Sequence, residues 1–229
     1  MTKTSQYKDF CICIDLDDTL YNEIEYVISG YKFIEKWIYD NNNKISFKIK
    51  KETIQNNINS HIQIFIKKNN LPERYIDYFV KILRDHKPII ELSRNNLEKL
   101  RKLKDKFKNL ILLTNGRSIS QRNKIESLKI TEFFNDILIS EEIGANKPDE
   151  KLYQKIIKKY KDHNILFVGD NIDVDLVTPI HLGYKTLLIK NIKNRIHNYD
   201  NNHPDFKNIS LIYDEFHHID DSDIIKLYY

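Results

Sequence analysis

Two aspartates follow the first hydrophobic run of the chain, with a single residue between them. Asp15 and Asp17 stand in the segment DLDDTLY, directly after FCICI. Because side chains alternate along an extended backbone, both carboxylates can point toward one pocket while Leu16 packs the other way. A carboxylate can attack phosphorus, and a second carboxyl group beside it can move a proton. The pair therefore indicates nucleophilic and acid–base chemistry at one place.

Polar residues also follow later hydrophobic runs of the chain. These clusters are TNG from Thr114, NKPD from Asn146 and GDNIDVD from Gly169. The Thr114 hydroxyl and the backbone amides of Asn115 and Gly116 precede a predicted helix, and they provide hydrogen-bond donors for phosphate oxygens. Lys147 adds a positive charge that can stabilise a developing anion. Together these groups favour an anionic, phosphorylated substrate.

Carboxylates this close together require a cation. Asp15 and Asp17 would repel each other and an anionic substrate unless a cation lay between them. Asp170 supplies a further hard oxygen ligand, and Asp15 with Asp170, waters and a substrate oxygen suits an octahedral ion. These clusters contain no histidine or cysteine, which argues against zinc. We therefore expect Mg²⁺ as the cofactor.

Strands and helices must alternate to place these clusters. The expected strands are the hydrophobic runs FCICI, LILL, ILIS, ILFV and YKTLLI, with a further candidate in FKNISLI. Helix-length amphipathic segments lie between them: 95–107, 118–128, 150–160 and 174–182. This alternation predicts an α/β fold with a doubly wound parallel sheet, in which ligands bind at the carboxyl ends of the strands.

The segment from residue 22 to residue 91 breaks the alternation. Its apolar residues follow helical spacing, namely Ile24, Val27, Ile28, Tyr31, Ile34 and Ile38, and further helical stretches follow over 45–83. We interpret residues 22–91 as an inserted helical cap, and residues 1–21 and 92–229 as the core. No internal repeat is visible.

Composition sets limits on the class of protein. The chain has 229 residues, of which 41% are hydrophobic, enough for one core plus a small inserted module. The net charge is +4, and the basic residues are scattered, which fits a small anionic substrate better than nucleic acid. Neither a signal sequence nor an apolar run of roughly 20 residues is present, so we expect a cytoplasmic protein without membrane partners. Cys11 and Cys13 fit neither a zinc site nor a disulfide framework and are assigned no role.

The clusters resemble, residue by residue and in order, the four signature motifs of the haloacid dehalogenase superfamily. The matching residues are Asp15 and Asp17 for the first motif, Thr114 for the second, Lys147 for the third, and Asp170 and Asp175 for the fourth. The resemblance covers nearly the whole chain, because the small helical cap of this family is inserted between its first and second motifs. It implies a Rossmann-like core that carries the cap.

The resemblance also implies a Mg²⁺-dependent phosphatase that works in two steps. Asp15 attacks phosphorus, while Asp17 first protonates the leaving oxygen and then activates water against the aspartyl phosphate. The metal ligands would be Asp15, Asp170 and the backbone carbonyl of Asp17. Thr114, Asn115 and Lys147 would bind the phosphate, and Asp175 would hold Lys147 or a metal-bound water.

Within the superfamily, two segments resemble pyrimidine 5'-nucleotidases and N-acylneuraminate-9-phosphatases. They are LLTNGRSISQRNK and ISEEIGANKPDEKLY. We therefore expect pyrimidine nucleoside monophosphates as substrates. Tyr26, Tyr31 and Trp37 could stack on the base, or they could form core, and the roles of Arg84 and His86 are equally open.

Alternative functions remain on the same scaffold. A sugar-phosphate phosphatase or a phosphomutase would keep both aspartates, and a phosphomutase would differ mainly in how its cap excludes water. A dehalogenase has no leaving oxygen to protonate, so Asp17 argues against it. A non-catalytic binding module would be expected to lack some of these residues. Asp18 is expected to be structural and Asp173 to face solvent.

Overall fold

A single parallel sheet organises the chain. The computed structural model describes residues 7–41, 62–63, 66–67, 70–190 and 202–229. Within them the strand order is β3-β2-β1-β4-β5-β6, and every pairing is parallel. The strands are β1 (Tyr7–Ile14), β2 (Phe107–Thr114), β3 (Asp136–Ile139), β4 (Asn164–Gly169), β5 (Lys185–Ile189) and β6 (Leu211–Tyr213). The order reverses direction between β1 and β4, where doubly wound sheets bind their ligands.

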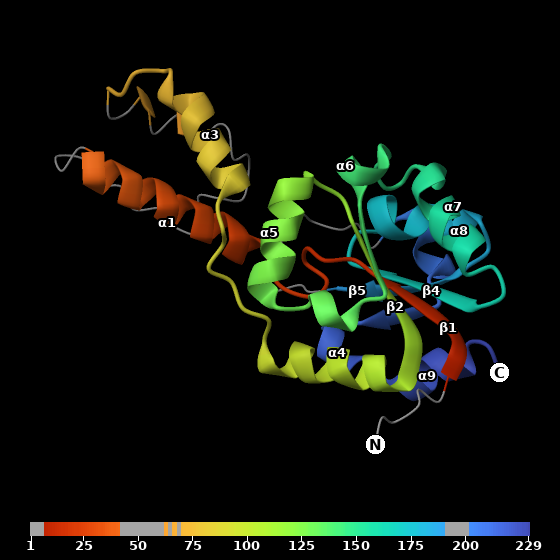
Figure 1. Ribbon diagram of the computed structural model, residues 1–229. Coiled ribbons are helices and arrows are strands. Elements are labelled where there is room, and N and C mark those ends of the chain that lie inside the picture. Colours follow the sequence, from red (N-terminus) through yellow and green to blue (C-terminus); the bar gives the residue numbers. More distant parts are fainter. Residues whose placement is uncertain (1–6, 42–61, 64–65, 68–69, 191–201) are drawn as a thin grey trace.

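Helices cover both faces of this sheet (Figure 1). The α-helices of the described residues are α1 (Glu23–Asn41), α3 (Tyr75–Asp85), α4 (Arg94–Lys106), α5 (Ser118–Leu128), α6 (Ser140–Ile143), α7 (Glu150–Lys159), α8 (Val177–His181) and α9 (Asp221–Lys226). Shorter turns include a π-helical turn, η3 (Ile172–Leu176), and 3₁₀ turns η2 (Thr131–Phe133), η4 (Pro204–Asn208) and η5 (Phe216–His218). The predicted α/β fold with a doubly wound parallel sheet is confirmed.

Strand β1 shows how the two layers form. Its even-numbered residues, such as Ile12, pack with apolar side chains of α4, α5 and α9, whereas Cys11 and Cys13 pack with those of α7. The two thiols lie on the same face, as expected, with their Sγ atoms 3.9 Å apart. From residue 10 to residue 14 both faces are buried, so this part of the strand is a continuous hydrophobic run without polar alternation.

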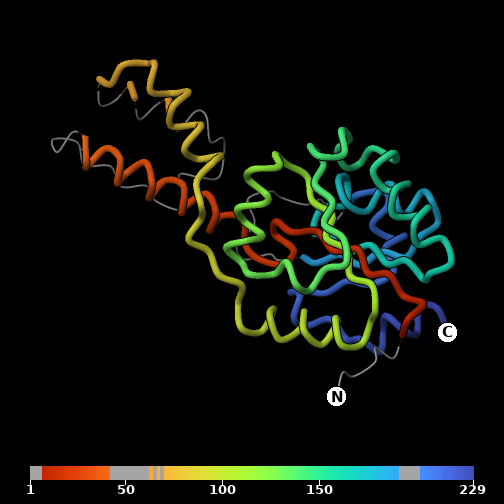
Figure 2. Tube along the Cα trace, viewed as in Figure 1, coloured from red at the N-terminus to blue at the C-terminus, as the bar shows by residue number. Residues whose placement is uncertain are grey.

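Helices α1 and α3 pack against each other and project from one end of the molecule (Figure 2). The buried side of α1 includes Ile24, Val27 and Ile34, which follow the predicted helical spacing. Trp37 of α1 packs on Phe79 of α3, with ring centroids 5.4 Å apart. Much of the predicted helical stretch 45–83 lies outside the described residues. The boundaries of core and cap stay a prediction.

One predicted helix differs from the structure. A single helix was expected over 174–182, but the chain forms the π turn η3 from Ile172 and only then α8. The side chain of Asn171 explains the early start, because its Oδ1 accepts a hydrogen bond from the amide of Val174 at 3.2 Å. A side chain that satisfies a free amide in this way begins a helical segment.

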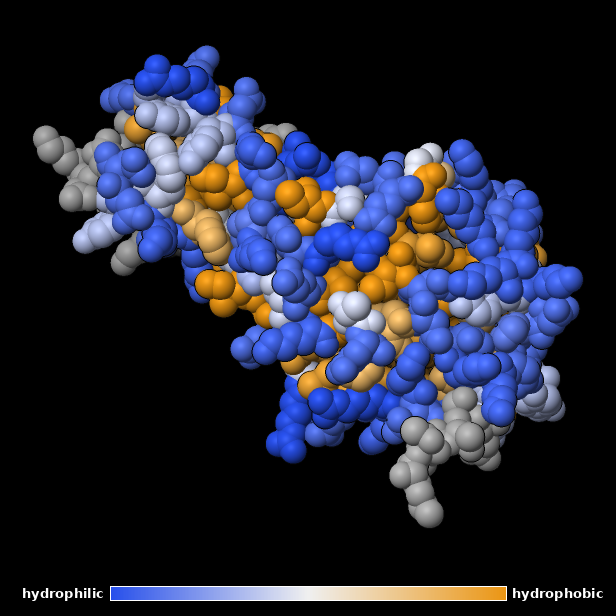
Figure 3. Space-filling model, in the orientation of Figure 1, coloured by the Kyte–Doolittle hydropathy of each residue, from blue (hydrophilic) through white to orange (hydrophobic). Residues whose placement is uncertain are grey.

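The surface agrees with the layered core. Figure 3 shows mostly hydrophilic side chains around the rim of the view, and hydrophobic ones toward its middle. Exposed large hydrophobic residues of the described part include Ile89, which is 76% exposed, and Ile119, which is 46% exposed. Among the described residues, no helix combines the length and the hydrophobicity needed to cross a membrane.

Candidate active site

Neighbouring strands bring the predicted residues together at one edge of the sheet. Asp15 follows β1, Thr114 ends β2 and Asp170 follows β4. Since β1 pairs in parallel with both β2 and β4, the three side chains meet at the carboxyl ends of the central strands. Lys147 reaches the same point from the loop between α6 and α7, and Asp175 reaches it from η3.

Lys147 lies between two of these carboxylates. Its Nζ is 2.5 Å from Asp15 Oδ1 and 2.5 Å from Asp175 Oδ1, and the residue is only 5% exposed. Burial by itself would lower the pKa of Lys147, but the two carboxylates outweigh burial and raise that pKa above its ordinary value. The ammonium group therefore stays charged next to Asp15.

The carboxylates of Asp15, Asp170 and Asp175 form a group suited to a hard cation. All three residues are buried, and their possible ligand atoms lie within 4.8 Å of one another. Thr19 Oγ1 lies between two of them, 3.4 Å from both Asp15 Oδ2 and Asp170 Oδ1. Lys147 contacts two of these three carboxylates, those of Asp15 and Asp175. Carboxylate oxygens that converge in this way suit a hard divalent cation such as Mg²⁺.

The surroundings of Asp15 favour its protonated form when no cation is bound. Burial is the largest influence and raises the pKa of this carboxyl, Lys147 lowers it, and the charges of Asp175 and Asp17 raise it again. The resulting pKa is about 7. A cation beside Asp15 would reverse this preference and keep the carboxylate ionised, as a nucleophile requires.

Asp17 lies in a second cluster, which sequence reasoning did not find. Lys124 Nζ contacts both of its carboxylate oxygens, at 2.8 and 2.9 Å. Gln121 Nε2 donates to Oδ2 at 2.9 Å, and the Tyr21 hydroxyl donates to Oδ1 at 2.6 Å. Burial alone would raise the pKa of Asp17, but these donors, with Lys124 foremost, hold it below its ordinary value. The described arrangement therefore favours ionised Asp17.

The cluster around Lys124 also includes side chains of α1. Glu23 Oε1 lies 3.8 Å from Lys124 Nζ, and the ring centroid of Tyr26 lies 4.2 Å from the same atom. Burial and the charge of Asp17 raise the pKa of Glu23 to about 8, although Lys124 lowers it. Lys124 thus joins the predicted acid–base residue to the first helix of the predicted cap.

The predicted phosphate-binding groups are partly engaged with each other. Thr114 Oγ1 accepts a hydrogen bond from Gln121 Nε2 at 2.7 Å, and the Gly116 amide donates to Ser140 Oγ at 2.9 Å. Asn115 exchanges two hydrogen bonds with the backbone of Lys147: its Nδ2 donates to the carbonyl at 3.0 Å and its Oδ1 accepts from the amide at 2.8 Å. The Asn115 side chain therefore positions the Lys147 loop.

Gly169 leaves room for Asp175. A Cβ atom at Gly169 would lie 2.5 Å from the Cβ of Asp175, closer than real Cβ atoms come. Asp175 Oδ2 accepts a hydrogen bond from the Asn171 amide at 3.0 Å, and the Tyr153 hydroxyl donates to the Asp175 carbonyl at 3.1 Å. These contacts fix the carboxylate that holds Lys147.

Asp18 and Asp173, which were not expected to take part in catalysis, lie as predicted. Asp18 is buried, has a positive φ of 54°, and accepts the amide of Glu23 at 2.9 Å, which fits the structural role expected of it. Asp173 is exposed, as expected, and lies 2.9 Å from His203 Nε2.

The aromatic residues considered for base stacking are packed. Tyr26 and Tyr31 are 9% and 3% exposed, and Trp37 packs on Tyr75 and Phe79 of α3. His86 stacks on Tyr26 with ring centroids 4.7 Å apart, and burial lowers the pKa of His86. In the described arrangement these rings build the contact between α1 and the chain around α3.

The chain is similar to known hydrolases. A family model described as haloacid dehalogenase-like hydrolase matches residues 12–189. A glyceraldehyde 3-phosphate phosphatase of Methanocaldococcus jannaschii is 28% identical over 78% of this chain and 83% of its own length. A pyrimidine 5'-nucleotidase of Escherichia coli is 30% identical, but over 33% of this chain and 35% of its own.

A solved structure agrees with this match in fold. A HAD-superfamily hydrolase of subfamily IA from Geobacter sulfurreducens superimposes with a TM-score of 0.66, covering 98% of this chain and 99% of that one at 15% identity. At that identity the likeness shows the fold alone. The family model itself covers most of the described core, including the residues of all four motifs. The chain therefore belongs to the haloacid dehalogenase-like hydrolase family, and it is an enzyme.

Proposed function

We propose that this enzyme is a phosphatase for small sugar phosphates, of the size and chemistry of glyceraldehyde 3-phosphate. The observation that carries the phosphatase part of this proposal is the group at the carboxyl edge of the sheet. There Asp15 lies 2.5 Å from Lys147, and its possible ligand atom lies within 4.8 Å of those of Asp170 and Asp175. A carboxylate, an ammonium group and further acids for a metal are the parts that phosphoryl transfer through an aspartate needs.

In the first step, a carboxylate oxygen of Asp15 forms a bond to phosphorus and the bond from phosphorus to the sugar oxygen breaks. Asp17 gives its proton to that leaving oxygen. In the second step, a water passes a proton to Asp17 and attacks the aspartyl phosphate. The bond from phosphorus to Asp15 then breaks, inorganic phosphate leaves, and Asp15 is restored. Lys147 balances negative charge on the transferring group throughout.

Mg²⁺ is the metal we propose, held by Asp15, Asp170 and the backbone carbonyl of Asp17. The donor set fits, because the buried side chains are carboxylates and Mg²⁺ prefers oxygen. When bound, it would neutralise charge on the phosphate and on Asp15. Thr19 keeps the Asp15 and Asp170 carboxylates aligned through its hydroxyl.

Lys124 positions Asp17 in this reaction. It contacts both carboxylate oxygens, so it fixes the direction in which the acid points. The ionised form that it favours is the form in which Asp17 accepts a proton from water in the second step. For the first step Asp17 must carry a proton, and that requires the contact with Lys124 to loosen.

Two observations support a sugar phosphate ahead of a nucleotide. The glyceraldehyde 3-phosphate phosphatase similarity extends over most of both chains, whereas the nucleotidase similarity covers about a third of each. In addition, Tyr26, Tyr31 and Trp37 are used in packing, so in this arrangement they are not available to stack on a base.

A release assay tests the substrate class. Inorganic phosphate would be measured with Mg²⁺ present for glyceraldehyde 3-phosphate, ribose 5-phosphate and UMP, and kcat/KM compared. We expect the sugar phosphates, led by the triose, to exceed UMP. A higher kcat/KM for UMP would support the second candidate, a pyrimidine 5'-nucleotidase, which the local similarity to the Escherichia coli enzyme favours. Isomerised sugar phosphate among the products would instead indicate a phosphomutase.

A further inference from the structure

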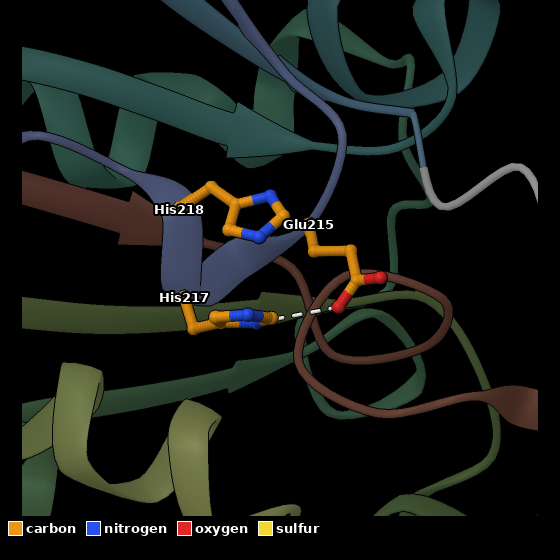
Figure 4. Close-up of side chains that lie close together, drawn as sticks. All are labelled: Glu215, His217 and His218. Carbon is orange, nitrogen blue, oxygen red and sulfur yellow. Dashed lines mark ion pairs between the residues drawn. The ribbon is translucent and has the colours of Figure 1, made fainter.

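A group of possible metal ligands lies on a different element from the carboxylate group described above. Glu215, His217 and His218 come from η5 and the residue before it, and each offers a ligand atom within 4.8 Å of the others. Figure 4 shows the three side chains, with Glu215 pointing toward the ring of His217. They follow β6 in the chain, and η5 packs against α4.

Folding already fixes the turn that carries these ligands. Phe216, between Glu215 and His217, is 1% exposed and belongs to the main hydrophobic core. The His218 amide donates to the Glu215 carbonyl at 3.0 Å, which closes the turn. Because the backbone is held in place, little further ordering is needed when the three side chains bind an ion.

The side chains are close but incompletely bonded. His217 Nδ1 lies 3.3 Å from Glu215 Oε2, yet this buried nitrogen makes no hydrogen bond of good geometry with any described residue. The rings of His217 and His218 have centroids 4.2 Å apart. A buried nitrogen beside a carboxylate and a second imidazole is the arrangement that a metal ion satisfies by coordination.

We propose that Glu215, His217 and His218 form a zinc site, separate from the magnesium site of the phosphatase. Two imidazoles and one carboxylate suit Zn²⁺, whereas the carboxylate group around Asp15 suits a hard ion. Three protein ligands leave one tetrahedral position open. Glu215 and His218 also line a pocket of about 670 Å³, so a small ligand or a water from that pocket can take the open position.

The pocket places the zinc site next to the connections to α1 and α3. Its wall includes Tyr21 and Asn22, just before α1, and Glu91 and Leu92, which lie between α3 and α4. The zinc ligands belong to neither connection. None of the three zinc ligands belongs to the proposed phosphatase machinery, so replacing them tests the zinc site separately.

Zinc binding would be measured by calorimetry on the full chain without an affinity tag, with Mg²⁺ present in excess. We expect one Zn²⁺ per chain, and a loss of affinity of at least about 100-fold when His217 and His218 are both replaced by alanine. Glu215→Gln should weaken binding while keeping the shape of the side chain. The control is His181→Ala, which removes a histidine whose side chain is 64% exposed, on α8, and should leave binding unchanged.

Three results would overturn the zinc site. One is binding of equal affinity in the double histidine variant, with its fold verified by circular dichroism. Another is zinc that binds only when Mg²⁺ is withdrawn and is displaced by it, which would place the ion at Asp15 and Asp170. Absence of zinc binding to the unmodified chain would have the same meaning. With Co²⁺ as the probe, a tetrahedral nitrogen and oxygen site should give a visible absorption band that the double variant lacks.

Discussion

Two buried lysines in this enzyme have similar surroundings, but their acidic partners come from different parts of the fold. Lys147 contacts Asp15 and Asp175, and Lys124 contacts Asp17 and Glu23. The side chains of Lys147 and Lys124 are 3% and 5% exposed. Each lysine therefore holds one aspartate of the proposed pair, and a second acid helps to keep the lysine charged.

The difference lies in where the second acid comes from. Asp175 belongs to η3, next to the sheet, whereas Glu23 begins α1, the first helix of the proposed cap. The ring of Tyr26, also in α1, lies against Lys124 as well. A shift of α1 would therefore alter the surroundings of Asp17 directly and those of Asp15 only indirectly. The proposed nucleophile is held by residues next to the sheet, and the proposed acid–base residue is held where α1 meets the core.

Replacing the nucleophile should have the largest effect. Asp15→Asn keeps the size of the side chain but cannot form the aspartyl phosphate, so kcat should fall by more than about 10⁴-fold. Phosphate release at high enzyme concentration measures the residual activity, and circular dichroism is the control for folding. Turnover near that of the unmodified enzyme would remove Asp15 from the mechanism.

The loss of activity on replacing Asp17, the proposed acid–base residue, should depend on the leaving group. Asp17→Asn should cost about 10² to 10⁴-fold in kcat with a sugar phosphate, whose leaving oxygen needs a proton. The loss should be much smaller with p-nitrophenyl phosphate, which leaves readily without one. Both substrates would be assayed with the same preparation. Equal losses would contradict the acid role of Asp17.

The same pair of substrates should distinguish the roles of the two lysines by the loss in kcat when each is replaced. Lys147→Met removes the positive charge that would balance the transferring phosphoryl group. The kcat should therefore fall by about 10² to 10³-fold with both sugar phosphate and p-nitrophenyl phosphate. Lys124→Met should lower kcat mainly with the sugar phosphate, because it acts through Asp17. Lys124→Arg, which keeps the charge, is the matched control. If Lys124→Met slowed both substrates equally, its action through Asp17 would be ruled out.

The smallest expected effect is the pH dependence of Mg²⁺ binding and of the stability that Mg²⁺ gives. Asp15 has a folded-state pKa of about 7, above the ordinary value of 3.8. Its protonated form therefore stabilises the metal-free fold fully below about pH 4, and this contribution is lost as the pH rises through 7. Mg²⁺ needs the ionised form, so its apparent affinity should fall about tenfold for each pH unit below 7. Thermal unfolding with and without Mg²⁺, at pH 5 and pH 8, measures this.

For the pH prediction, the control is Asp15→Asn, in which the pH dependence of Mg²⁺ stabilisation should weaken. Asp170 would then remain as a ligand, while the carboxylate that Lys147 contacts at position 15 would be gone. An enzyme stabilised by Mg²⁺ equally at both pH values would show that Asp15 is ionised throughout this range, against its proposed surroundings.

The sequence predicted the sheet and the first cluster because strand ends are local signals. A buried hydrophobic run that stops at a polar residue marks a carboxyl end, and parallel strands bring such ends together. Asp15, Thr114 and Asp170 lie at such strand ends, and the topology brings them together. Lys147 lies in the loop between α6 and α7, and only its place in the series of motifs predicts it. The helix over 118–128 was also predicted with the bounds that the structure has.

The second cluster could not be found in the same way. Gln121 and Lys124 lie within a helix, and their partners Asp17 and Glu23 are about a hundred residues away in the chain, so only the fold brings them together. One signal was present: Gln121 and Lys124 precede Ile125 and Leu128 at helical spacing, which places two polar residues on the apolar side of α5. Thr19, within the first motif, was overlooked because its two acceptors come from different strands.

The tight packing around Gly169 should make this position intolerant of substitution. Position 169 contributes no functional group, yet the space that a side chain would fill is occupied by Asp175. A methyl group there would push that carboxylate, and through it Lys147, away from Asp15. In a library of random variants selected for activity, this position should therefore be as restricted as the aspartates proposed to be catalytic, although no proposed chemical step uses it.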